Sequence, residues 1–255
     1  MSTINGYDNE YEFVKYFNNK VVKELDPTSH DLITTIFNLK SDDSLIKCWR
    51  NHLPQKADIL IKIEDHIKGV SIKKGIKNSV HAESIVSFSS FLKKLGISED
   101  IIDEYKYYHY ADGTKNGTGD MRYSGEWYKN NYPEQIQRIN DEFNKPDIIL
   151  AAADRFIITG TNGIYPISAL IYGEANDYIW ISANDIKKIL LSKKDLQSSG
   201  VHIGSLQVQP QNRCLNKNPL YEKDRNKVQI KWYNLLDNYL EYSYFKTNNI
   251  VLNNY

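Results

Sequence analysis

Lys56–Glu83 reads KADILIKIEDHIKGVSIKKGIKNSVHAE, and this stretch decides the fold. It contains two β-branched runs, Ala57–Ile63 and Gly69–Lys73, which are separated by polar residues. Valine and isoleucine favour strands, and a polar interval between two such runs favours a reversal of the chain. The stretch therefore predicts two antiparallel strands that are neighbours in one sheet.

An aspartate and a lysine come together in this prediction. Asp58 opens the first strand and Lys73 closes the second, so pairing of the strands places both at one end of the sheet. Ser71 and Lys73 are two residues apart in a strand and share a face. A carboxylate beside a lysine can hold a divalent cation while the ammonium lies near an attacking water, as phosphodiester hydrolysis requires. These residues predict a metal-dependent phosphodiesterase site.

A second carboxylate is needed, because Asp58 alone is too little for a magnesium site. Ser79–Leu95 is expected to form a helix, with Glu83 in its first turns. A helix packed against the sheet could return Glu83 to the metal, whereas His81 would point away from Glu83 by roughly 200° around the helix. The alternative role of Glu83 is a first-turn acid favoured by the helix dipole.

Further elements are predicted on both sides of this stretch. The expected helices are Asn9–Leu25, His30–Leu39, Tyr132–Ala153 with a break at Pro146, Asn184–Leu191 and Val228–Tyr239. The expected strands are Arg155–Ile158, Ala169–Tyr172, Tyr178–Ser182 and Ser205–Gln209, and Asp112–Gly125 is expected to be a loop. No linker or internal repeat marks a second domain. The pattern predicts a single α/β domain with a mixed central β-sheet flanked by α-helices.

Asp58, the triplet Ser71-Ile72-Lys73 and the residues around Glu83 resemble the PD-(D/E)xK nuclease superfamily, in particular type II restriction endonucleases. In that superfamily an Asp begins the second core strand, and an acid-x-Lys triplet lies on the third. Ala57 stands here in place of the proline, and Ser71 in place of the acid. Some restriction enzymes have Ser-x-Lys and take the missing carboxylate from the next helix, a role that the resemblance gives to Glu83.

The N-terminal helix contributes another candidate acid. Asn9–Glu12 with Phe17-Asn18 looks like the N-terminal helix of these enzymes, whose glutamate can complete the metal site. Glu10 shares a helical face with apolar residues, whereas Glu12 aligns with polar ones. Burying a carboxylate costs free energy unless it is paired or binds a metal, so an acid on the buried face is the better candidate for a functional role. This favours Glu10 over Glu12. The alternative for Glu10 is an ordinary acid of an N-terminal helix.

The C-terminal segment resembles that of restriction enzymes and carries residues suited to DNA. Gln, Asn and Arg give bidentate contacts to base edges, and lysines bind phosphates. The candidates are Gln209, Gln211, Asn212, Arg213, Lys217 and Arg225, with Lys115 and Arg122 of the glycine-rich loop as weaker ones. An ordinary polar loop is the alternative for this segment. For Arg122 and Arg155, structural ion pairs with Asp120 and Asp154 are the favoured interpretation.

Charge and cysteine content permit such a protein. The net charge is zero, but 98–142 holds ten acidic and five basic residues, and 202–232 holds six basic and two acidic. DNA binding needs a basic face and not a basic total. No secretory signal or membrane span is expected, and two distant cysteines, Cys48 and Cys214, suit a reducing cytoplasm.

The resemblance implies a sequence-specific, Mg²⁺-dependent double-stranded DNA endonuclease of the restriction type. Asp58 and Glu83 would hold Mg²⁺, Lys73 would orient the nucleophilic water, and Glu10 would assist. Within one domain of 1–255, residues 1–100 would form the catalytic core and 100–255 the DNA-recognition and supporting elements.

Cutting both strands implies a homodimer, and restriction implies a cognate DNA methyltransferase in the same system. Three alternatives stay open: a structure-specific repair nuclease of the same superfamily, a catalytically decayed DNA-binding protein, and an unrelated α/β protein.

Overall fold

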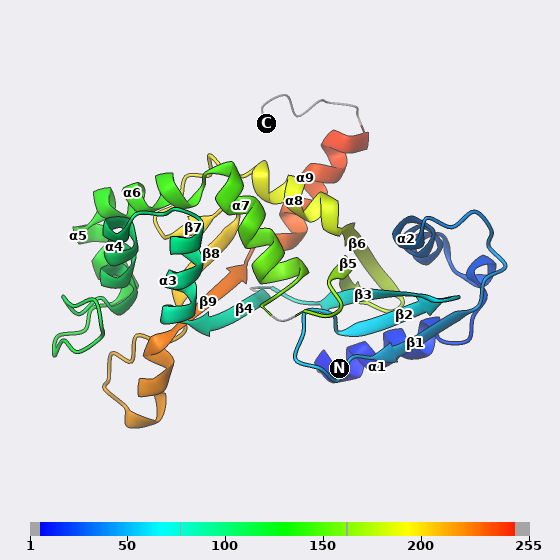
Figure 1. Ribbon diagram of the computed structural model, residues 1–255, viewed down its shortest axis with the longest axis horizontal. Helices are drawn as coiled ribbons and strands as arrows, with labels where there is room; N and C mark the ends of the chain where they lie inside the picture. The colour runs from blue at the N-terminus through cyan, green and yellow to red at the C-terminus, as the bar shows by residue number, and fades with distance from the viewer. Residues whose placement is uncertain (1–5, 77, 162, 248–255) are drawn as a thin grey trace. The chain divides into compact units, whose positions relative to one another are not determined.

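The computed structural model describes residues 6–76, 78–161 and 163–247 of the 255 (Figure 1). These residues form a mixed α/β fold that divides into two compact units. The first unit holds residues 6–78, 153–189 and 236–247, and the second holds 79–152 and 190–235. Each unit is therefore assembled from separate stretches of chain, and no boundary falls at residue 100. The single domain stays a prediction.

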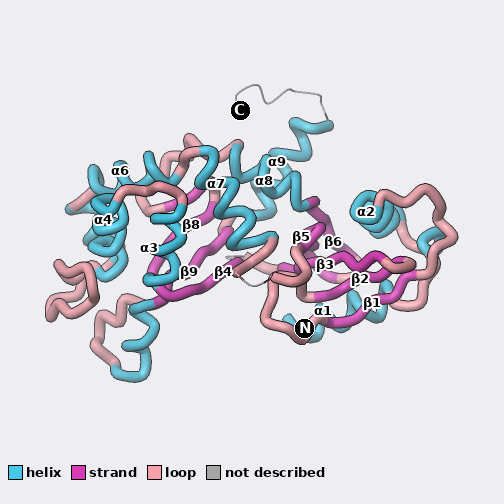
Figure 2. The backbone as a smooth tube through the Cα atoms, viewed as in Figure 1, coloured by secondary structure: helices cyan, strands magenta, loops and turns pink. Residues whose placement is uncertain are grey.

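The first unit contains a five-stranded mixed sheet in the order β1-β2-β3-β5-β6 (Figure 2). Its strands are β1 (Ile46–Arg50), β2 (Ile59–Ile63), β3 (His66–Lys73), β5 (Ile167–Glu174) and β6 (Asp177–Ser182). The pairs β1/β2, β2/β3 and β5/β6 are antiparallel, and β3/β5 is parallel. The predicted antiparallel pairing of 57–63 with 69–73 is confirmed.

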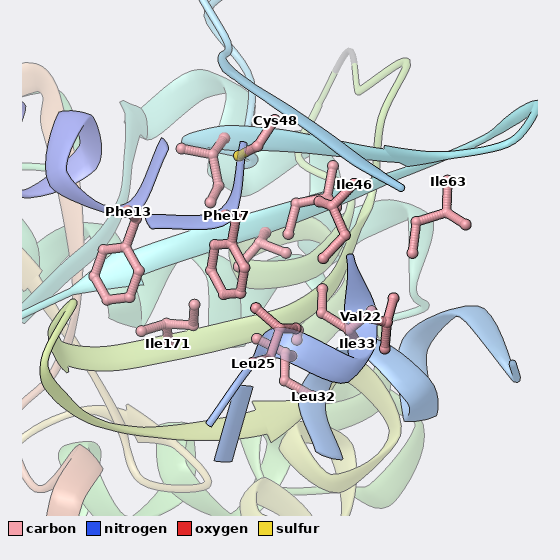
Figure 3. Close-up of a cluster of buried hydrophobic side chains, with 14 of the residues drawn as sticks. Phe13, Phe17, Val22, Leu25, Leu32, Ile33, Ile46, Cys48, Ile63 and Ile171 are labelled. Carbon is pink, nitrogen blue, oxygen red and sulfur yellow. The ribbon is translucent and has the colours of Figure 1, made fainter. Parts of the chain in front are cut away.

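Two helices pack on this sheet through an apolar cluster. They are α1 (Gly6–Phe17) and α2 (Pro27–Phe37), joined by the 3₁₀ turn η1 (Val22–Glu24). The Asp26 carboxylate caps α2 by accepting hydrogen bonds from the backbone amides of Thr28 and Ser29. Figure 3 shows Phe13 and Phe17 of α1 in the buried cluster with residues of α2 and the sheet. This packing holds α1, and with it Glu10, against the sheet.

Two other helices contribute to the first unit. Most of α8 (Ala183–Leu191) belongs to it, as does most of α9 (Leu235–Thr247). The Tyr242 hydroxyl on α9 donates to the Asp185 carboxylate on α8 at 2.7 Å. The π-helix η2 (Asp154–Ile158) continues α7 (Pro146–Ala153).

The second unit contains a four-stranded sheet in the order β4-β9-β8-β7. Its strands are β4 (Asn78–Ser84), β9 (Lys227–Trp232), β8 (Leu206–Pro210) and β7 (His202–Ile203). Its helices are α3 (Ile85–Lys94), α4 (Glu99–Tyr110), α5 (Gly125–Asn131) and α6 (Pro133–Phe143), with the 3₁₀ helix η3 (Pro219–Asn226). As predicted, the chain between α4 and α5 is a loop.

Several predicted elements are wrong in type or extent. Ser79–Leu95 is not one helix: its first residues form β4 in a sheet with β9, and Ser84 caps the helix that follows. Val228–Tyr239 begins as strand β9, in which alternate residues are buried. Arg155–Ile158 is a π-helix and not a strand, because a short apolar run does not distinguish the two. The first helix ends at Phe17 instead of Leu25.

Candidate active site

Asp58 is fixed at the start of β2 by backbone hydrogen bonds on both sides. Its amide donates to the carbonyl of Val70 at 2.9 Å, and its carbonyl accepts from the amide of Asn51 at 3.0 Å. Gly69 permits this close approach of chains: a Cβ there would lie 2.8 Å from the Cβ of Ala57 and 2.9 Å from the carbonyl oxygen of Pro166. The glycine therefore lets the Asp58 segment and β5 both pack tightly beside β3.

The Asp58 carboxylate collects donors from the end of β3. Its Oδ2 accepts from the Ser71 hydroxyl at 2.9 Å, the Ile72 amide at 2.6 Å and the Lys73 ammonium at 3.1 Å. Lys73 Nζ also donates to Ser71 Oγ at 2.8 Å and to the Ile72 carbonyl at 3.0 Å. The structure thus brings Asp58 and Lys73 together, and the shared face of Ser71 and Lys73 is confirmed, whereas the catalytic roles stay predictions.

This ion pair is only partly exposed. The Lys73 and Asp58 side chains retain 22% and 23% of their accessible surface. A half-buried charge pair is less screened than a surface pair, yet its atoms stay accessible to a small ligand. The cluster therefore stays accessible to a small ligand while most of its surface is shielded from water.

Glu10 of α1 lies in the same neighbourhood, held by Arg50 of β1. Its Oε2 accepts a hydrogen bond from Arg50 Nε at 3.0 Å, and Arg50 Nη2 forms an ion pair with the same oxygen at 3.0 Å. Burial raises the pKa of Glu10, and the negative charge of Asp58 raises it further, against the opposing effects of Arg50 and Lys73. Arg50 is paired with Ile59, the residue after Asp58, in the β1/β2 ladder, so the carboxylate that Arg50 holds lies at the same end of the sheet as Asp58.

Glu12 has a different environment, as the sequence predicted. Its side chain is 49% exposed and pairs with Lys15 one turn along the same helix, at 2.9 Å. The Glu10 side chain is 18% exposed. Glu10 is thus the more buried of the two acids, as expected from the helical pattern, and its role at the metal site stays a prediction.

The oxygen atoms of this cluster fit a hard cation. Lys73 Nζ lies within 3.1 Å of a carboxylate, a hydroxyl and a carbonyl oxygen, so a positive charge already occupies an all-oxygen environment here. Magnesium is bound in proteins by one or two carboxylates, with waters and substrate oxygens completing its shell. No group of three or more His, Cys, Asp or Glu suited to a metal is found among the described residues. Asp58 is therefore the carboxylate that the described residues bring to this cluster, and the magnesium site stays a prediction.

Glu83 does not lie where the sequence placed it. It is on strand β4 and not in the first turn of a helix, so it shares a face with His81 instead of pointing away from it. His81 Nε2 lies 3.6 Å from Glu83 Oε1, and the Ser87 hydroxyl donates to Glu83 Oε2 at 2.5 Å. Glu83 belongs to the second unit, and its role as a magnesium ligand stays a prediction.

The second unit contains a polar cleft of about 540 Å³. It is lined by two of the predicted DNA-binding residues, Gln209 of β8 and Arg213, together with Gln207. Lys129 and Asn130 of α5 also line it, and the sequence analysis did not select them. Lys129 forms no ion pair with any residue in the described part of the chain. Lysine and arginine suit phosphate contacts and amide side chains suit base contacts, and the cleft combines both kinds with one acid, Glu126.

The arginine of this cleft is fixed in place. Arg213 Nη2 donates to the backbone carbonyl of Tyr108 at 2.8 Å, and its guanidinium lies 5.0 Å from the centre of the Tyr108 ring. Gln209 Nε2 donates to Gln229 Oε1 at 3.4 Å. These contacts orient the two side chains before any ligand arrives.

Two arginines predicted to contact DNA have structural partners instead. Arg225 is buried and pairs with the buried Asp112 carboxylate at 2.8 Å. Burial opposes ionisation of Asp112, yet hydrogen bonds from Thr114 and Arg225 hold its pKa below the usual value. Arg122 makes a bidentate pair with Glu222, at 2.7 and 2.9 Å, and not the expected pair with Asp120.

The remaining DNA-binding candidates differ in exposure. Gln211 and Lys217 are exposed, and Lys217 lies 3.9 Å from Asp120. Asn212 accepts a hydrogen bond from the amide of Cys214 at 2.7 Å, which shapes the turn after β8. Lys115 is half exposed and pairs with Asp103 at 2.7 Å. The roles of these four residues in DNA binding stay predictions.

Comparisons with known proteins establish the class of fold. No protein-family model and no curated protein matches the chain. Among solved structures, restriction endonuclease MspI in complex with its cognate DNA is similar, with a TM-score of 0.59 and 14% identity over 91% of this chain and 93% of that chain. The chain therefore has a restriction-endonuclease-like fold, and the predicted fold class is confirmed. In the described residues, no helix has the length and apolar character of a membrane span.

Proposed function

We propose that this protein is a Mg²⁺-dependent, sequence-specific endonuclease of double-stranded DNA, of the type II restriction class with a Ser-x-Lys motif. The observation that carries the proposal is the cluster of Asp58, Ser71 and Lys73 at one end of the sheet, beside Glu10. The restriction-endonuclease-like fold supports it, and the MspI structure contains that enzyme's cognate DNA. A similar fold alone does not define an activity, so the proposal of nuclease activity depends on the cluster of Asp58, Ser71 and Lys73.

Asp58, the Ile72 carbonyl and Glu10 would hold Mg²⁺, with Glu83 as the further carboxylate that the sequence predicts. A bound Mg²⁺ would neutralise charge on the scissile phosphate and lower the pKa of its water.

Lys73 and Arg50 have separate roles in this proposal. The Lys73 ammonium, anchored by Asp58 and Ser71, is placed to orient the attacking water and to stabilise developing negative charge. Arg50 holds the carboxylate of Glu10 through a hydrogen bond from Nε and an ion pair with Nη2.

Cutting both strands requires two active centres, so we propose a homodimer acting on a symmetric site. A cell carrying such an activity must protect its own DNA, and a cognate methyltransferase is therefore part of the proposal. The binding surface would be the polar cleft with Gln209, Arg213 and Lys129.

Digestion of unmethylated phage DNA tests the proposal. Purified protein with Mg²⁺ is expected to give sharp bands, and EDTA is expected to abolish them. A smear would favour a repair nuclease that reads DNA structure instead of sequence.

A second candidate function is DNA binding without cleavage, which one observation favours: Ser71 supplies a hydroxyl where the superfamily has an acid. In that case the protein would retard DNA in a salt-dependent manner and leave it uncut.

The role of Glu83 needs its own variant. We expect Glu83→Gln to lower the cleavage rate by at least about 10²-fold if this carboxylate completes the metal site. Glu99→Gln, which alters an exposed acid of α4, is the matched control and should cleave like the natural protein. Full activity of Glu83→Gln would remove Glu83 from the mechanism and leave Glu10 as the second carboxylate.

A further inference from the structure

A cavity of about 300 Å³ in the second unit is lined mainly by aromatic residues, together with Ala111, Gly113 and Gln135. The lining residues that carry the argument are Tyr107, Tyr123, Trp127, Tyr128, Tyr132 and Gln135. They come from the end of α4, from α5 and its flanks, and from α6. A volume of this order is at the small end of the range for ligand-binding pockets.

The rings form one continuous wall. Tyr123 and Trp127 stack with centroids 3.7 Å apart and an interplanar angle of 13°. Tyr132 lies against Trp127 at 5.9 Å and against Tyr128 at 4.8 Å, and it is 46% exposed. Aromatic surface left in contact with water costs free energy, so a flat ligand that covers these rings would be stabilised.

One polar group gives the cavity a preferred hydrogen-bonding partner. The Tyr128 hydroxyl donates to Oε1 of Gln135 at 2.6 Å, which leaves the amide nitrogen of Gln135 as a donor. That nitrogen has no hydrogen-bond partner elsewhere in the described chain. A ligand that offers an acceptor, such as a ring nitrogen or a carbonyl, would satisfy it.

The charge of the lining narrows the ligand class. None of the described residues that line the cavity carries a formal charge. Phosphate would find no cation here. A quaternary ammonium can bind aromatic rings, but it has no acceptor for the amide donor of Gln135. The lining suits a flat, uncharged ring with hydrogen-bond acceptors, which is the description of a nucleobase.

The position of the cavity indicates where such a base would come from. Helix α5 has only seven residues and borders two hollows: Trp127 and Tyr128 line the aromatic cavity, and Lys129 and Asn130 line the polar cleft. A strand whose phosphate is bound by Lys129 would pass within about one helix diameter, roughly 10 Å, of the aromatic cavity.

We propose that the aromatic cavity binds an unstacked base of a DNA strand, with the base against Trp127 and Tyr132 and an acceptor facing Gln135. The choice of DNA as the source of the base rests on the proposed function. Extruding a base from a duplex costs free energy, which stacking on aromatic rings offsets. The cavity would thereby favour sites with an easily unpaired base.

Binding of bulged DNA in EDTA tests this proposal without any cleavage. One duplex carries a single unpaired adenine, and its partner carries an abasic unit at the same place. The full-length protein is expected to bind the bulged adenine about 5- to 100-fold more tightly, as one stacked base contributes. Trp127→Ala and Gln135→Leu are each expected to shrink that ratio, whereas Tyr221→Ala, an exposed tyrosine outside the cavity, should keep it.

The outcomes separate this proposal from the nuclease proposal. Equal affinity for both duplexes, an unchanged ratio in Trp127→Ala and Gln135→Leu, or no binding of either duplex would overturn the base-binding proposal. A clear preference for the adenine that needs Trp127 supports it even if no DNA is ever cut. Mg²⁺-dependent cleavage together with equal affinity would leave the nuclease standing and remove the base-binding cavity.

Discussion

Each unit contains an ion pair between a basic side chain and an aspartate, and the two pairs differ in how exposed they are. Lys73 and Asp58 in the first unit retain about a fifth of their side-chain surface, at 22% and 23%. Arg225 and Asp112 in the second unit retain 3% and 0%. The first pair can exchange partners with a cation or a phosphate, whereas the second cannot do so without opening the fold. Exposure, and not the presence of an ion pair, separates the candidate catalytic charges from the structural ones.

The largest effect is expected from removing the accessible cation. Lys73→Ala should lower Mg²⁺-dependent cleavage by at least about 10³-fold, because it removes the group placed to orient water and stabilise charge. Single-turnover cleavage of a mapped DNA site measures it. Lys68→Ala, on the same strand but outside the cluster, is the matched control. Equal loss in both variants would indicate damage to the strand and not to the chemistry.

The buried pair should respond in stability instead. Arg225→Ala leaves Asp112 as an uncompensated buried charge, and we expect the free energy of unfolding to fall by about 3–5 kcal/mol. Urea denaturation followed by circular dichroism measures this change. If Arg225 instead contacted DNA as the sequence suggested, the variant would keep its stability and lose DNA affinity.

The two pairs also differ in how far the sequence could predict them. Asp58 and Lys73 are 15 residues apart on a hairpin, so local pattern and strand alternation suffice to bring them together. Asp112 and Arg225 are 113 residues apart, and their meeting depends on the tertiary fold of the second unit. Nothing in the local sequence distinguishes Arg225 from an exposed arginine of a polar segment.

The wrong prediction of a helix at residues 79–84 also arose because tertiary contacts cannot be inferred from the local sequence. The apolar pattern of Ser79–Leu95 predicted a helix with Glu83 in its first turns, but pairing of residues 78–84 in the sheet with β9 overrides that local preference. The true cap is Ser84, which accepts a hydrogen bond from the amide of Ser87. The polar cleft was missed in part because Lys129 and Asn130 carry no signature until α5 is placed beside β8.

Buried histidines of the second unit should make the stability of the protein depend on pH. Burial lowers the pKa of His109 to about 4 and lowers that of His202 as well. The unfolded chain, with histidine pKa near 6.5, therefore binds more protons than the folded chain at pH 4–6.5. Stability present above pH 6.5 should fall as the pH drops, by roughly 2 kcal/mol at pH 5 for His109. Denaturation at pH 7 and pH 5 measures it, and a flat profile would contradict it.

The smallest effect is expected at the polar cleft. Lys129→Ala should weaken DNA binding several-fold for all sequences and reduce the slope of log affinity against log salt by about 1, as the loss of one phosphate contact does. Fluorescence anisotropy over a range of salt measures both quantities. Lys223→Ala, which removes a surface lysine of η3, is the control and should leave the slope unchanged. Identical slopes for both variants would place the DNA elsewhere.

The most direct test of the central claim compares two aspartates of the same sheet. Asp58→Ala removes the carboxylate that organises the cluster, and Asp65→Ala removes a fully exposed one in the turn between β2 and β3. With Mg²⁺ and a cleavable DNA, we expect no cleavage by Asp58→Ala and normal cleavage by Asp65→Ala, while both bind DNA in EDTA. Cleavage by Asp58→Ala at the rate of the natural protein would contradict the assignment of this cluster as the active site.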